Sequence, residues 1–571
     1  MKKICTKCGK EYSKKEKFCI SCGGELVKVD NKISVQGEEN KVISPAKKFL
    51  NVVLTVFIAI IIGLMIGIGI LFALNVYKNR PVKYQDSILV QYLEDGVIVI
   101  AYGKSYHFDE NVLIRYNIDK TSIALTDKNN TLYFINESGC STISDNVDEF
   151  KISNNGNAIA FITSSIEDTL EINLSNVTYQ HGELYLYNVD TQTNSLINSD
   201  VVYELSDNYY NDIYIHMNGL LYNSIVISEN GNSVGYISNV EFNAENDTIS
   251  WQSYINTNGL ENTFEKNSLF YAINDDTSCV YWNNLDKSGV YCANMITNET
   301  NKLASTLENN EVGLTFNKDY TECLVFYNDK TYISENCKDP KLICDFCMYN
   351  IYNSSICRNN DFLFGYYYVT ALNIDTFSNN VFGDENAFYY LKKEKNDWIY
   401  EKINSNSTFV YTSLDSKYIY TIKNSNNSLV KTSTNSTEKE IVEIGKNVGS
   451  AVISSNEKYV YYIDKVTSDL YCFDGKTSTK IDYDVKNIFE YNNTFYYIKD
   501  IDTNGFGTLY CSSKGHEGVK VEHGIDVYVI KVSKDGAFFI SIDDVDKNLG
   551  TLYQINNKTD AILIEENVYY Y

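Results

Sequence analysis

Histidine, the side chain used most often in acid–base catalysis, is scarce in this chain of 571 residues, which contains only five. No two of them have the spacing of a metal-binding pair on a helix, since they stand at His107, His181, His216, His516 and His523. We also expect no nucleophile elbow of the Gly-x-Ser-x-Gly type. Because so little of a catalytic constellation is visible, we predict that the protein is not an enzyme. The alternative is a site whose residues converge from distant parts of the chain.

Positive charge is also scarce, with 49 Lys and Arg against 74 Asp and Glu and a net charge of -25. The first 48 residues depart from this balance, because they carry 12 Lys against 6 acidic residues. The remainder of the chain is therefore strongly acidic. An acidic surface repels phosphates, so we do not expect this part to bind nucleic acid.

Long hydrophobic runs are rare as well, and a single run is long enough to cross a membrane. Val52–Leu74 contains no charged residue, and a helix of this length, at about 1.5 Å per residue, spans the roughly 30 Å hydrocarbon layer. The basic residues before the run outnumber those shortly after it, which favours a cytoplasmic N-terminus. Gly63 and Gly67 form a Gly-x-x-x-Gly pair that could join two such helices in a homodimer, although glycine is common in membrane helices in general.

Four cysteines near the N-terminus form two Cys-x-x-Cys pairs, Cys5 with Cys8 and Cys19 with Cys22, separated by ten residues. This spacing suits tetrahedral Zn²⁺, because each pair can chelate from a tight turn. Glycines follow both pairs, where a turn with positive φ would require them. Two disulfides are the alternative. Four cysteine ligands leave no open position for water, so the predicted zinc is structural rather than catalytic.

The run Cys5-Thr6-Lys7-Cys8-Gly9, together with Cys19-Ile20-Ser21-Cys22-Gly23, resembles the zinc ribbon at the start of many bacterial membrane proteins. Those ribbons often have proline after the first cysteine of a pair, where this chain has Thr6 and Ile20. The resemblance implies a small cytosolic module that docks a protein partner. Its many lysines leave two other interpretations open: contact with nucleic acid or a regulator, and attraction to an anionic lipid surface.

The chain beyond residue 88 contains a degenerate repeat of about 40 residues. Each copy has Ile-Ser or Val-Ser, a polar turn with Asn, Asp or Gly, and a strand rich in apolar and aromatic residues. Clear copies begin at Ile152, Ile227, Ile453 and Val532. A unit of this length holds four short strands, which is typical of a β-propeller blade.

This repeat resembles the WD40-like propeller repeats of TolB and of the prolyl oligopeptidase relatives. The resemblance implies an all-β fold with a propeller of about seven or eight four-stranded blades. About ten candidate units are visible, so we expect some inserted β units. The chain ends within the repeats at Tyr571, and we expect no appended hydrolase domain.

Two further patterns in the repeat region have alternative interpretations. Asp500–Gly505 resembles the start of a calcium loop, but Cys511 stands where a bidentate Glu is needed, so an ordinary turn is preferred. Disulfides are expected among the cysteines of this region, for example between Cys279 and Cys292 across one hairpin. A second zinc site is the alternative at one cysteine cluster, Cys337, Cys344, Cys347 and Cys357.

The sequence thus predicts a zinc ribbon at 1–28, a cytoplasmic linker at 29–48, a transmembrane helix at 49–77, a linker at 78–87 and an extracytoplasmic propeller-like domain at 88–571. We predict a single-pass bacterial membrane protein whose propeller recognises an envelope or external partner and whose ribbon docks a cytosolic one. One alternative is an extracytoplasmic enzyme with its site in the propeller funnel, and another is a ribbon that contacts nucleic acid or a regulator. The expected cofactor is structural Zn²⁺, and no catalytic residue is assigned.

Overall fold

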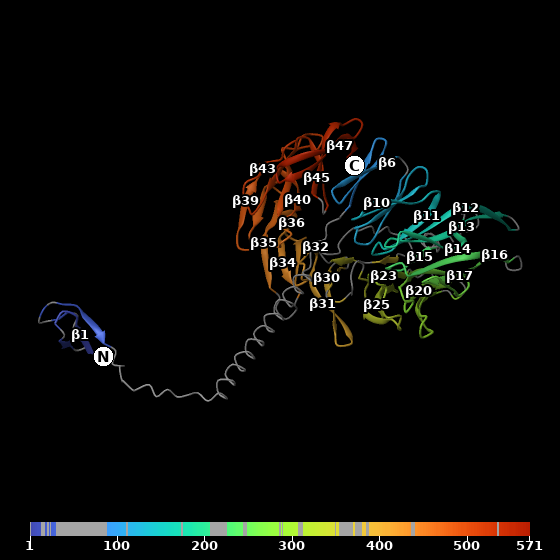
Figure 1. Cartoon of the computed structure of the whole chain (residues 1–571), viewed down its shortest axis with the longest axis horizontal. Coiled ribbons are helices and arrows are strands. Elements are labelled where there is room, and N and C mark those ends of the chain that lie inside the picture. The colour runs from blue at the N-terminus through green and yellow to red at the C-terminus, as the bar shows by residue number, and fades with distance from the viewer. Residues whose placement is uncertain are drawn as a thin grey trace, which may run out of the picture. The chain divides into compact units, whose positions relative to one another are not determined.

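The computed structural model describes residues 2–8, 10–12, 18–19, 22, 24–29, 88–109, 112–172, 175–205, 225–243, 248–284, 287, 289–305, 312–348, 350–352, 369–371, 378, 380–383, 387–434, 440–533 and 536–570. The chain divides into two units, Met1–Arg80 and Pro81–Tyr571, called here the N-terminal unit and the body. Every regular element in the described ranges is a strand (Figure 1).

The N-terminal unit contains three short strands, β1 (Lys2–Cys5), β2 (Glu11–Tyr12) and β3 (Leu26–Val29), in the order β2-β1-β3. The central strand β1 is antiparallel to both neighbours. Among its described residues, the buried apolar side chains are those of Cys5 and Cys19. Two buried side chains are too few for the hydrophobic effect to stabilise a fold. Another stabilising interaction is therefore needed.

The body is a succession of antiparallel units, most with four strands that follow one another in the chain. It begins with a three-stranded unit, β4 (Ile88–Leu93), β5 (Gly96–Ala101) and β6 (Lys104–Asp109). Three four-stranded units follow: β7 (Leu113–Tyr116), β8 (Ile123–Thr126), β9 (Leu132–Asn136) and β10 (Gly139–Ser144); β11 (Val147–Ile152), β12 (Ala158–Ile172), β13 (Ser175–Asn188) and β14 (Thr193–Leu205); β15 (Ile225–Ile227), β16 (Ser233–Asn243), β17 (Thr248–Thr257) and β18 (Leu260–Thr263).

The middle of the body has three units and one additional strand. The units are β19 (Ser268–Ile273), β20 (Val280–Asn284), β21 (Gly289–Asn294) and β22 (Glu299–Ser305); β23 (Val312–Phe316), β24 (Glu322–Tyr327), β25 (Lys330–Glu335) and β26 (Lys341–Cys344); β27 (Asn350–Tyr352), β29 (Asn380–Gly383), β30 (Ala387–Glu394) and β31 (Asp397–Ser405). The additional strand β28 (Val369–Ala371) pairs in parallel with β23.

Four units complete the body. They are β32 (Ser407–Thr412), β33 (Tyr418–Lys423), β34 (Leu429–Ser433) and β35 (Ile441–Gly445); β36 (Val448–Ile453), β37 (Val460–Asp464), β38 (Leu470–Phe473) and β39 (Ser478–Asp482); β40 (Val485–Tyr491), β41 (Thr494–Lys499), β42 (Thr508–Ser512) and β43 (Val519–Lys520); β44 (Val527–Ser533), β45 (Gly536–Asp544), β46 (Leu549–Asn557) and β47 (Asp560–Tyr569).

Aromatic side chains fill the space between successive units. The ring of Tyr461 on β37 stacks on that of Phe495 on β41, with centroids 3.7 Å apart. Strands such as β5, β19 and β41 are buried along their whole length, which requires apolar residues on both faces. The abundance of tyrosine is thus explained by packing between units, since Tyr236, Tyr281, Tyr461 and Tyr497 are among the largest fully buried side chains.

The repeated Ile-Ser turn joins the first and second strands of a unit. Its serine hydroxyl accepts a hydrogen bond from the backbone N–H five residues later, at 2.9–3.0 Å, in the turns that begin at Ser153, Ser228, Ser413 and Ser454. An asparagine side chain does the same at Asn117, Asn274 and Asn317. The repeat is therefore a hydrogen-bonded turn that either residue type can close.

Equivalent turns of several consecutive units meet one another. The Asn154 side chain donates to the backbone carbonyl of Lys318, 3.1 Å away, although 164 residues separate them. The Lys318 Nζ atom lies 3.5 Å from Asp119 and 3.9 Å from Glu229. The hydroxyl of Ser228 donates to Asp275 at 2.6 Å. Units that are successive in the chain thus present the same turn to a shared place, as propeller blades do.

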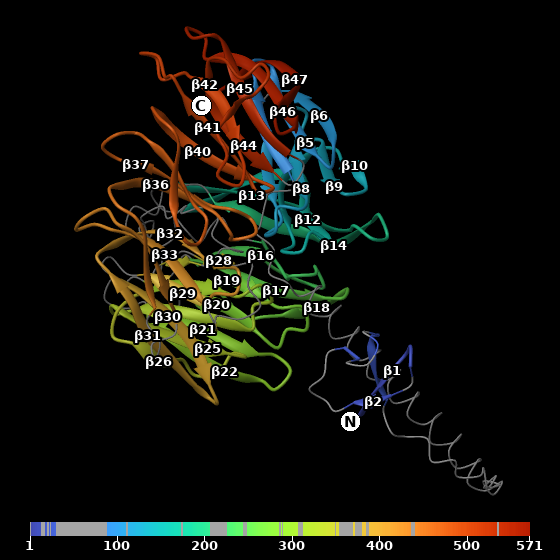
Figure 2. The ribbon, with the colours of Figure 1, turned by 90° about the vertical axis from the view of Figure 1, so that its left-hand side faces the viewer.

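The first and last units of the body are joined. β4 pairs with β47 at Leu93 and Val568, so one sheet runs in the order β46-β47-β4-β5-β6 (Figure 2). The buried Gln91 side chain donates to the carbonyl of Tyr569 and accepts from Lys531. Pairing between the two ends of the repeat region protects edge strands that would otherwise be open.

These observations confirm an all-β, propeller-like fold made largely of four-stranded units. The predicted membrane helix at 49–77, with Gly63 and Gly67, lies outside the described residues, as do 30–48 and 78–87. No helix that could span a membrane is found in the described part of the chain. The predicted localisation, a single-pass membrane protein with a cytoplasmic N-terminus, has no support in the described residues.

Candidate functional site

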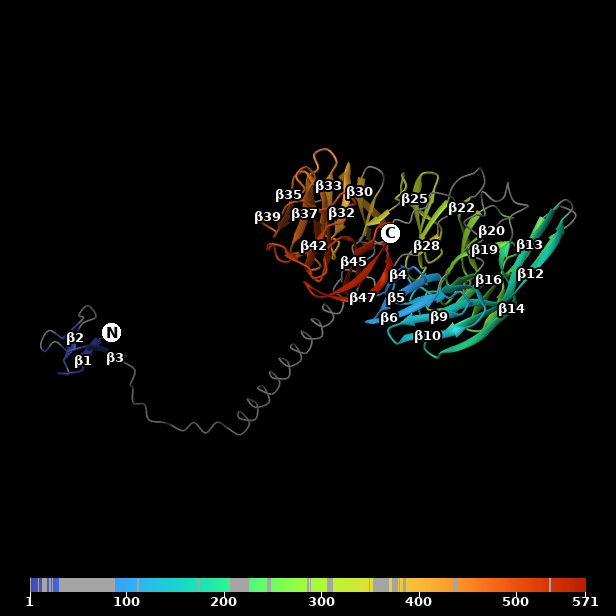
Figure 3. The ribbon, with the colours of Figure 1, turned by 90° about the horizontal axis from the view of Figure 1, so that it is seen from above.

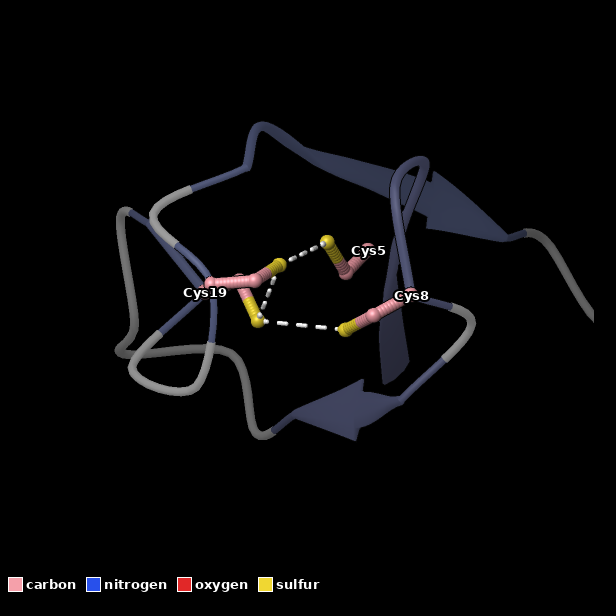
Figure 4. A group of neighbouring side chains, drawn as sticks. Cys5, Cys8 and Cys19 are labelled. Atoms are coloured by element: carbon pink, nitrogen blue, oxygen red, sulfur yellow. Dashed lines mark hydrogen bonds between the residues drawn. The ribbon is translucent and has the colours of Figure 1, made fainter.

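The four cysteines predicted as zinc ligands come together in the N-terminal unit, where their sulfur atoms all lie within 4.8 Å of one another. The Sγ–Sγ distance is 3.4 Å for Cys8–Cys19 and for Cys19–Cys22, and 3.6 Å for Cys5–Cys22. Figure 4 shows Cys5, Cys8 and Cys19 directed toward a common centre. In each pair one cysteine is buried and one is exposed.

Tight turns hold the two cysteine pairs in place. The N–H of Cys5 donates to the carbonyl of Lys10 at 3.0 Å, and the N–H of Cys19 donates to the carbonyl of Gly24 at 2.9 Å. The N–H of Lys7 donates to Cys5 Sγ at 3.4 Å, a contact that stabilises a thiolate. At least one backbone donor, the N–H of Lys7, thus faces a cysteine sulfur.

Gly24 is needed for a reason that differs from the predicted one. The sequence suggested glycines with positive φ after each cysteine pair, but Gly24 is not in the left-handed region. Its Cβ would instead lie 2.9 Å from both Cys5 Sγ and Lys7 Cβ, so a larger residue would push the two chain segments apart. Gly9 and Gly23 are outside the described residues.

The donor set fits a metal ion. None of the four cysteines is paired in a disulfide, and no His, Asp or Glu atom belongs to the cluster. In the described part of the chain this is the one group of His, Cys, Asp and Glu ligand atoms close enough to hold a metal. The coarser prediction, an N-terminal metal site, is thus supported.

The described body cysteines do not come together as the second zinc site that was the alternative to disulfides. Cys337 packs in a different hydrophobic core from Cys344, because the first joins the β19–β22 unit and the second faces β29 and β30. Cys357 is outside the described residues. Cys279 and Cys292 are both buried and free, and Cys292 pairs across the hairpin with Tyr281 rather than with Cys279.

One histidine of the body lies between two carboxylates. His181 on β13 has Nδ1 2.6 Å from Asp200 on β14 and Nε2 3.2 Å from Asp168 on β12. The imidazole is 15% exposed, whereas the two carboxylates are about half exposed. Tyr179, two residues earlier on the same face of β13, lies 5.4 Å from the imidazole ring. Burial, together with Asp168 and Asp200, raises the pKa of the Tyr179 hydroxyl.

A cavity of about 500 Å³ adjoins this acid–imidazole cluster. It lies where two units merge into one sheet, because β14 pairs with β16 at Val202 and Ile237 (Figure 3). Its lining is mostly polar: Tyr179, Asp200, Val202, Asn239, Val240, Glu241, Gln252, Tyr254 and Lys266. The site therefore combines a proton-carrying group with room for a polar molecule.

The remaining histidines lack such surroundings in the described ranges. His107 forms an exposed pair with Glu565 at 2.7 Å, and His523 stacks on Tyr553. His216 is outside the described residues. The spacing of residues along the sequence could not identify His181 as a site residue, because its partners Asp168 and Asp200 lie on the two neighbouring strands.

A Gly-x-Ser-x-Gly string does occur, at Gly231–Gly235, contrary to expectation. It is not a nucleophile elbow, because Ser233 follows a β-turn and begins strand β16. The Ser233 side chain is fully buried, and its hydroxyl lies 3.0 Å from the carbonyl of Asp275.

The Asp500–Gly505 segment is a turn, which is the interpretation that the sequence favoured over a calcium loop. One carboxylate oxygen of Asp502 accepts hydrogen bonds from the N–H groups of Asn504 and Phe506, both at 2.9 Å. The carboxylate thus closes the turn itself.

No protein-family model and no curated protein matches the sequence. Among the solved structures with limited similarity to it are the following three. Dipeptidyl peptidase 4 of Porphyromonas gingivalis aligns over 80% of this chain and 59% of its own, at 9% identity and a TM-score of 0.33. The tricorn protease aligns over 85% and 58%, at 10% identity and a TM-score of 0.25. The acylaminoacyl peptidase of Pyrococcus horikoshii aligns over 60% and 52%, at 12% identity and a TM-score of 0.22. This chain spans less than two thirds of each.

The three structures named here are peptidases, and they give no support to the predicted non-enzymatic binding and sensing role. We therefore correct both that role and the prediction that the chain is not an enzyme. At TM-scores this low, the similarity assigns neither an activity nor active-site residues to this chain. The predicted partners, among them an external protein and a Gly63–Gly67 homodimer, stay predictions.

Proposed function

We propose that the N-terminal unit is a structural zinc module. The observation that carries this proposal is the convergence within 4.8 Å of four thiols that are not in disulfides, with no other ligand type among them. An all-thiolate tetrahedral set favours Zn²⁺ over the harder Mg²⁺ and Ca²⁺. Bound zinc would supply the stabilisation that the three short strands lack, since metal binding and folding are coupled in so small a unit.

The test is the zinc content of the purified full-length chain and of two serine variants. We expect one zinc per chain in the native protein, and at least about a tenfold loss of affinity in Cys8→Ser, which removes one of four ligands. Cys140→Ser is the matched control, because Cys140 is an exposed free thiol of the body, and it should keep full binding. If Cys8→Ser held one zinc as tightly as the native chain, the proposal would be wrong.

For the body, we infer acid–base catalysis on a polar substrate at the acid–imidazole cluster. Asp200 lines the cavity and lies 2.6 Å from Nδ1 of His181, so the imidazole would exchange a proton with a bound molecule through that carboxylate. This site differs from the predicted funnel site, because it lies on β12–β14 and β16–β17. The support is the contact geometry together with the adjoining cavity.

The catalytic proposal can be tested with p-nitrophenyl acetate as a probe of imidazole-dependent hydrolysis. We expect His181→Asn to lower the rate by about a hundredfold, the usual contribution of a positioned acid–base group. His107→Asn is the control, since that histidine also pairs with a carboxylate at 2.7 Å, but its partner Glu565 does not line the cavity, whereas Asp200, the partner of His181, does. Equal rates in both variants would exclude His181 as the acid–base group.

We also propose that seven or eight of the described units form a closed propeller and that the others are insertions. The pairing of β4 with β47 and the meeting of equivalent turns at Lys318 support closure. The additional parallel strand β28 is a candidate insertion.

A further inference from the structure

Cys337 occupies a backbone position that is normally reserved for glycine. Asn336 and Cys337 are the central residues of the turn after β25, with φ values of 51° and 55°. The turn is closed by a hydrogen bond from the N–H of Lys338 to the carbonyl of Glu335, at 3.2 Å. Positive φ at both central residues defines a type I′ turn, for which Asn-Gly is the preferred pair. Asparagine is present here, but cysteine replaces glycine.

The side chain of Cys337 accounts for this substitution, because it reaches into the neighbouring unit. Its residue is only 2% exposed and belongs to the core that contains Cys279, Cys292 and Cys323 of the adjacent strands. The Sγ atom lies 4.0 Å from the carbonyl oxygen of Val280, the residue that follows Cys279. Cysteine is strained at this positive φ and glycine is not. The presence of cysteine therefore indicates that its side chain makes a contact that glycine could not make.

Two thiols are within reach of Cys337, and they are not equivalent. Cys292 Sγ lies 3.8 Å from the Ser334 hydroxyl, so it has another partner. Contact with Cys337, together with burial, raises the pKa of the Cys279 thiol. Cys279 stands immediately before β20, in the turn closed by Asn274, and faces Cys337 from the other unit.

We propose that Cys279 and Cys337 form a disulfide that covalently links the β19–β22 unit to the β23–β26 unit. The bond would close a loop that contains all of β20–β25, and it would hold the turn of one unit against the core of the next. Such a bond would retain cysteine at the strained position because only that residue can form it. This inference is independent of the zinc and acid–base proposals.

Formation of the bond requires an oxidant, for which a low-molecular-weight disulfide is suitable. One protein thiolate attacks that disulfide and releases a small thiol, which gives a mixed disulfide. The second protein thiolate then displaces the other small thiol and forms the Sγ–Sγ bond. Overall, two protein S–H bonds are lost and two small thiols are produced, so the electrons and protons balance. Both thiols are almost fully buried, so the exchange takes place before the two units pack.

The experiment uses the full-length chain, unfolded in urea and refolded with oxidised and reduced glutathione. Free thiols are then alkylated, the protein is digested, and cross-linked peptides are identified by mass spectrometry. We expect a peptide pair joined through Cys279 and Cys337, two hydrogen masses lighter than the separate peptides. We also expect the native chain to melt at a lower temperature when a reductant is present.

Two variants separate a disulfide from ordinary packing. Cys337→Gly removes the thiol and suits the turn, so its melting temperature should not respond to the reductant. Cys472→Ala, a buried free cysteine in another unit, should keep both the cross-link and the response. A cross-link between Cys292 and Cys337 would overturn the assignment. Full alkylation of Cys279 and Cys337 after refolding would overturn the proposal itself.

Discussion

At the scale of single residues, the body contains a buried lysine whose surroundings disfavour its charged form. Lys151 on β11 lies 3.9 Å from a carboxylate oxygen of Glu149, and the same oxygen already accepts a hydrogen bond from Arg115 at 2.7 Å. Burial and the Arg115 charge lower the pKa of Lys151 from 10.5 to about 8, although Glu149 opposes this change. The Glu149 carboxylate therefore contacts two cations, Arg115 and Lys151. Keeping the buried lysine charged lowers the stability of the folded state.

We predict that Lys151→Met raises the free energy of unfolding at pH 7 by roughly 1–3 kcal/mol. The upper limit is the free energy that corresponds to the difference between the pKa of Lys151 in the folded chain and its ordinary value. Below about pH 8 the lysine is protonated in the folded and unfolded states, so the native chain bears the full cost. Between pH 8 and about 10.5 the folded chain loses the proton first, and its stability rises toward that of the variant.

Urea unfolding of both chains at pH 7 and pH 10 measures this difference. Lys480→Met serves as the control, because Lys480 pairs with Asp469 at 2.7 Å but is half exposed, and its removal should change stability little at either pH. A Lys151→Met chain less stable than the native chain at pH 7 would show that the Glu149 contact outweighs the burial.

At the scale of elements, the repeated turns could be predicted because their chemistry is local. Gly156 and Gly231 have φ values of 77° and 80°, as expected for glycine in the Ile-Ser turn. The third copy has Glu457 at that position, with φ 58°. No local pattern explains a glutamate in place of glycine, but the structure does. The Glu457 carboxylate accepts hydrogen bonds from the N–H of Leu414 at 2.6 Å and from the Tyr411 hydroxyl at 3.1 Å. Both donors belong to the preceding unit.

The acid–imidazole cluster could not be predicted, because it depends on strand register. His181 is opposite Ile166, and the irregular pairing between Thr163 and Ile166 decides which residues of β12 face β13. An irregularity of this kind moves each later side chain to a different partner, so Asp168 cannot be assigned to His181 from spacing. The four zinc-site cysteines were predictable, since two short turns suffice to bring them together.

At the scale of the whole molecule, the two units are stabilised by different interactions. The body has hydrophobic cores shared between neighbouring units, such as the one that joins β41 and β42 to β45 and β46. The N-terminal unit buries only Cys5 and Cys19 among its described apolar residues, so we expect its folding to depend on a bound metal. Loss of metal should therefore affect one unit and leave the other intact.

We predict that a strong zinc chelator makes only the first 30 residues of the full-length chain sensitive to protease and leaves the melting temperature of the body unchanged. Apparent zinc binding contributes about 10–16 kcal/mol to folding in comparable modules, so its removal should unfold the N-terminal unit completely. Limited proteolysis with mass spectrometry locates the cuts, and calorimetry follows the body. The Cys8→Ser chain should behave in the same way without chelator. The prediction would be wrong if the chelator also lowered the melting temperature of the body. If the body of the Cys8→Ser chain then melted at the native temperature without chelator, a metal bound within the body would have to contribute to the stability of the body.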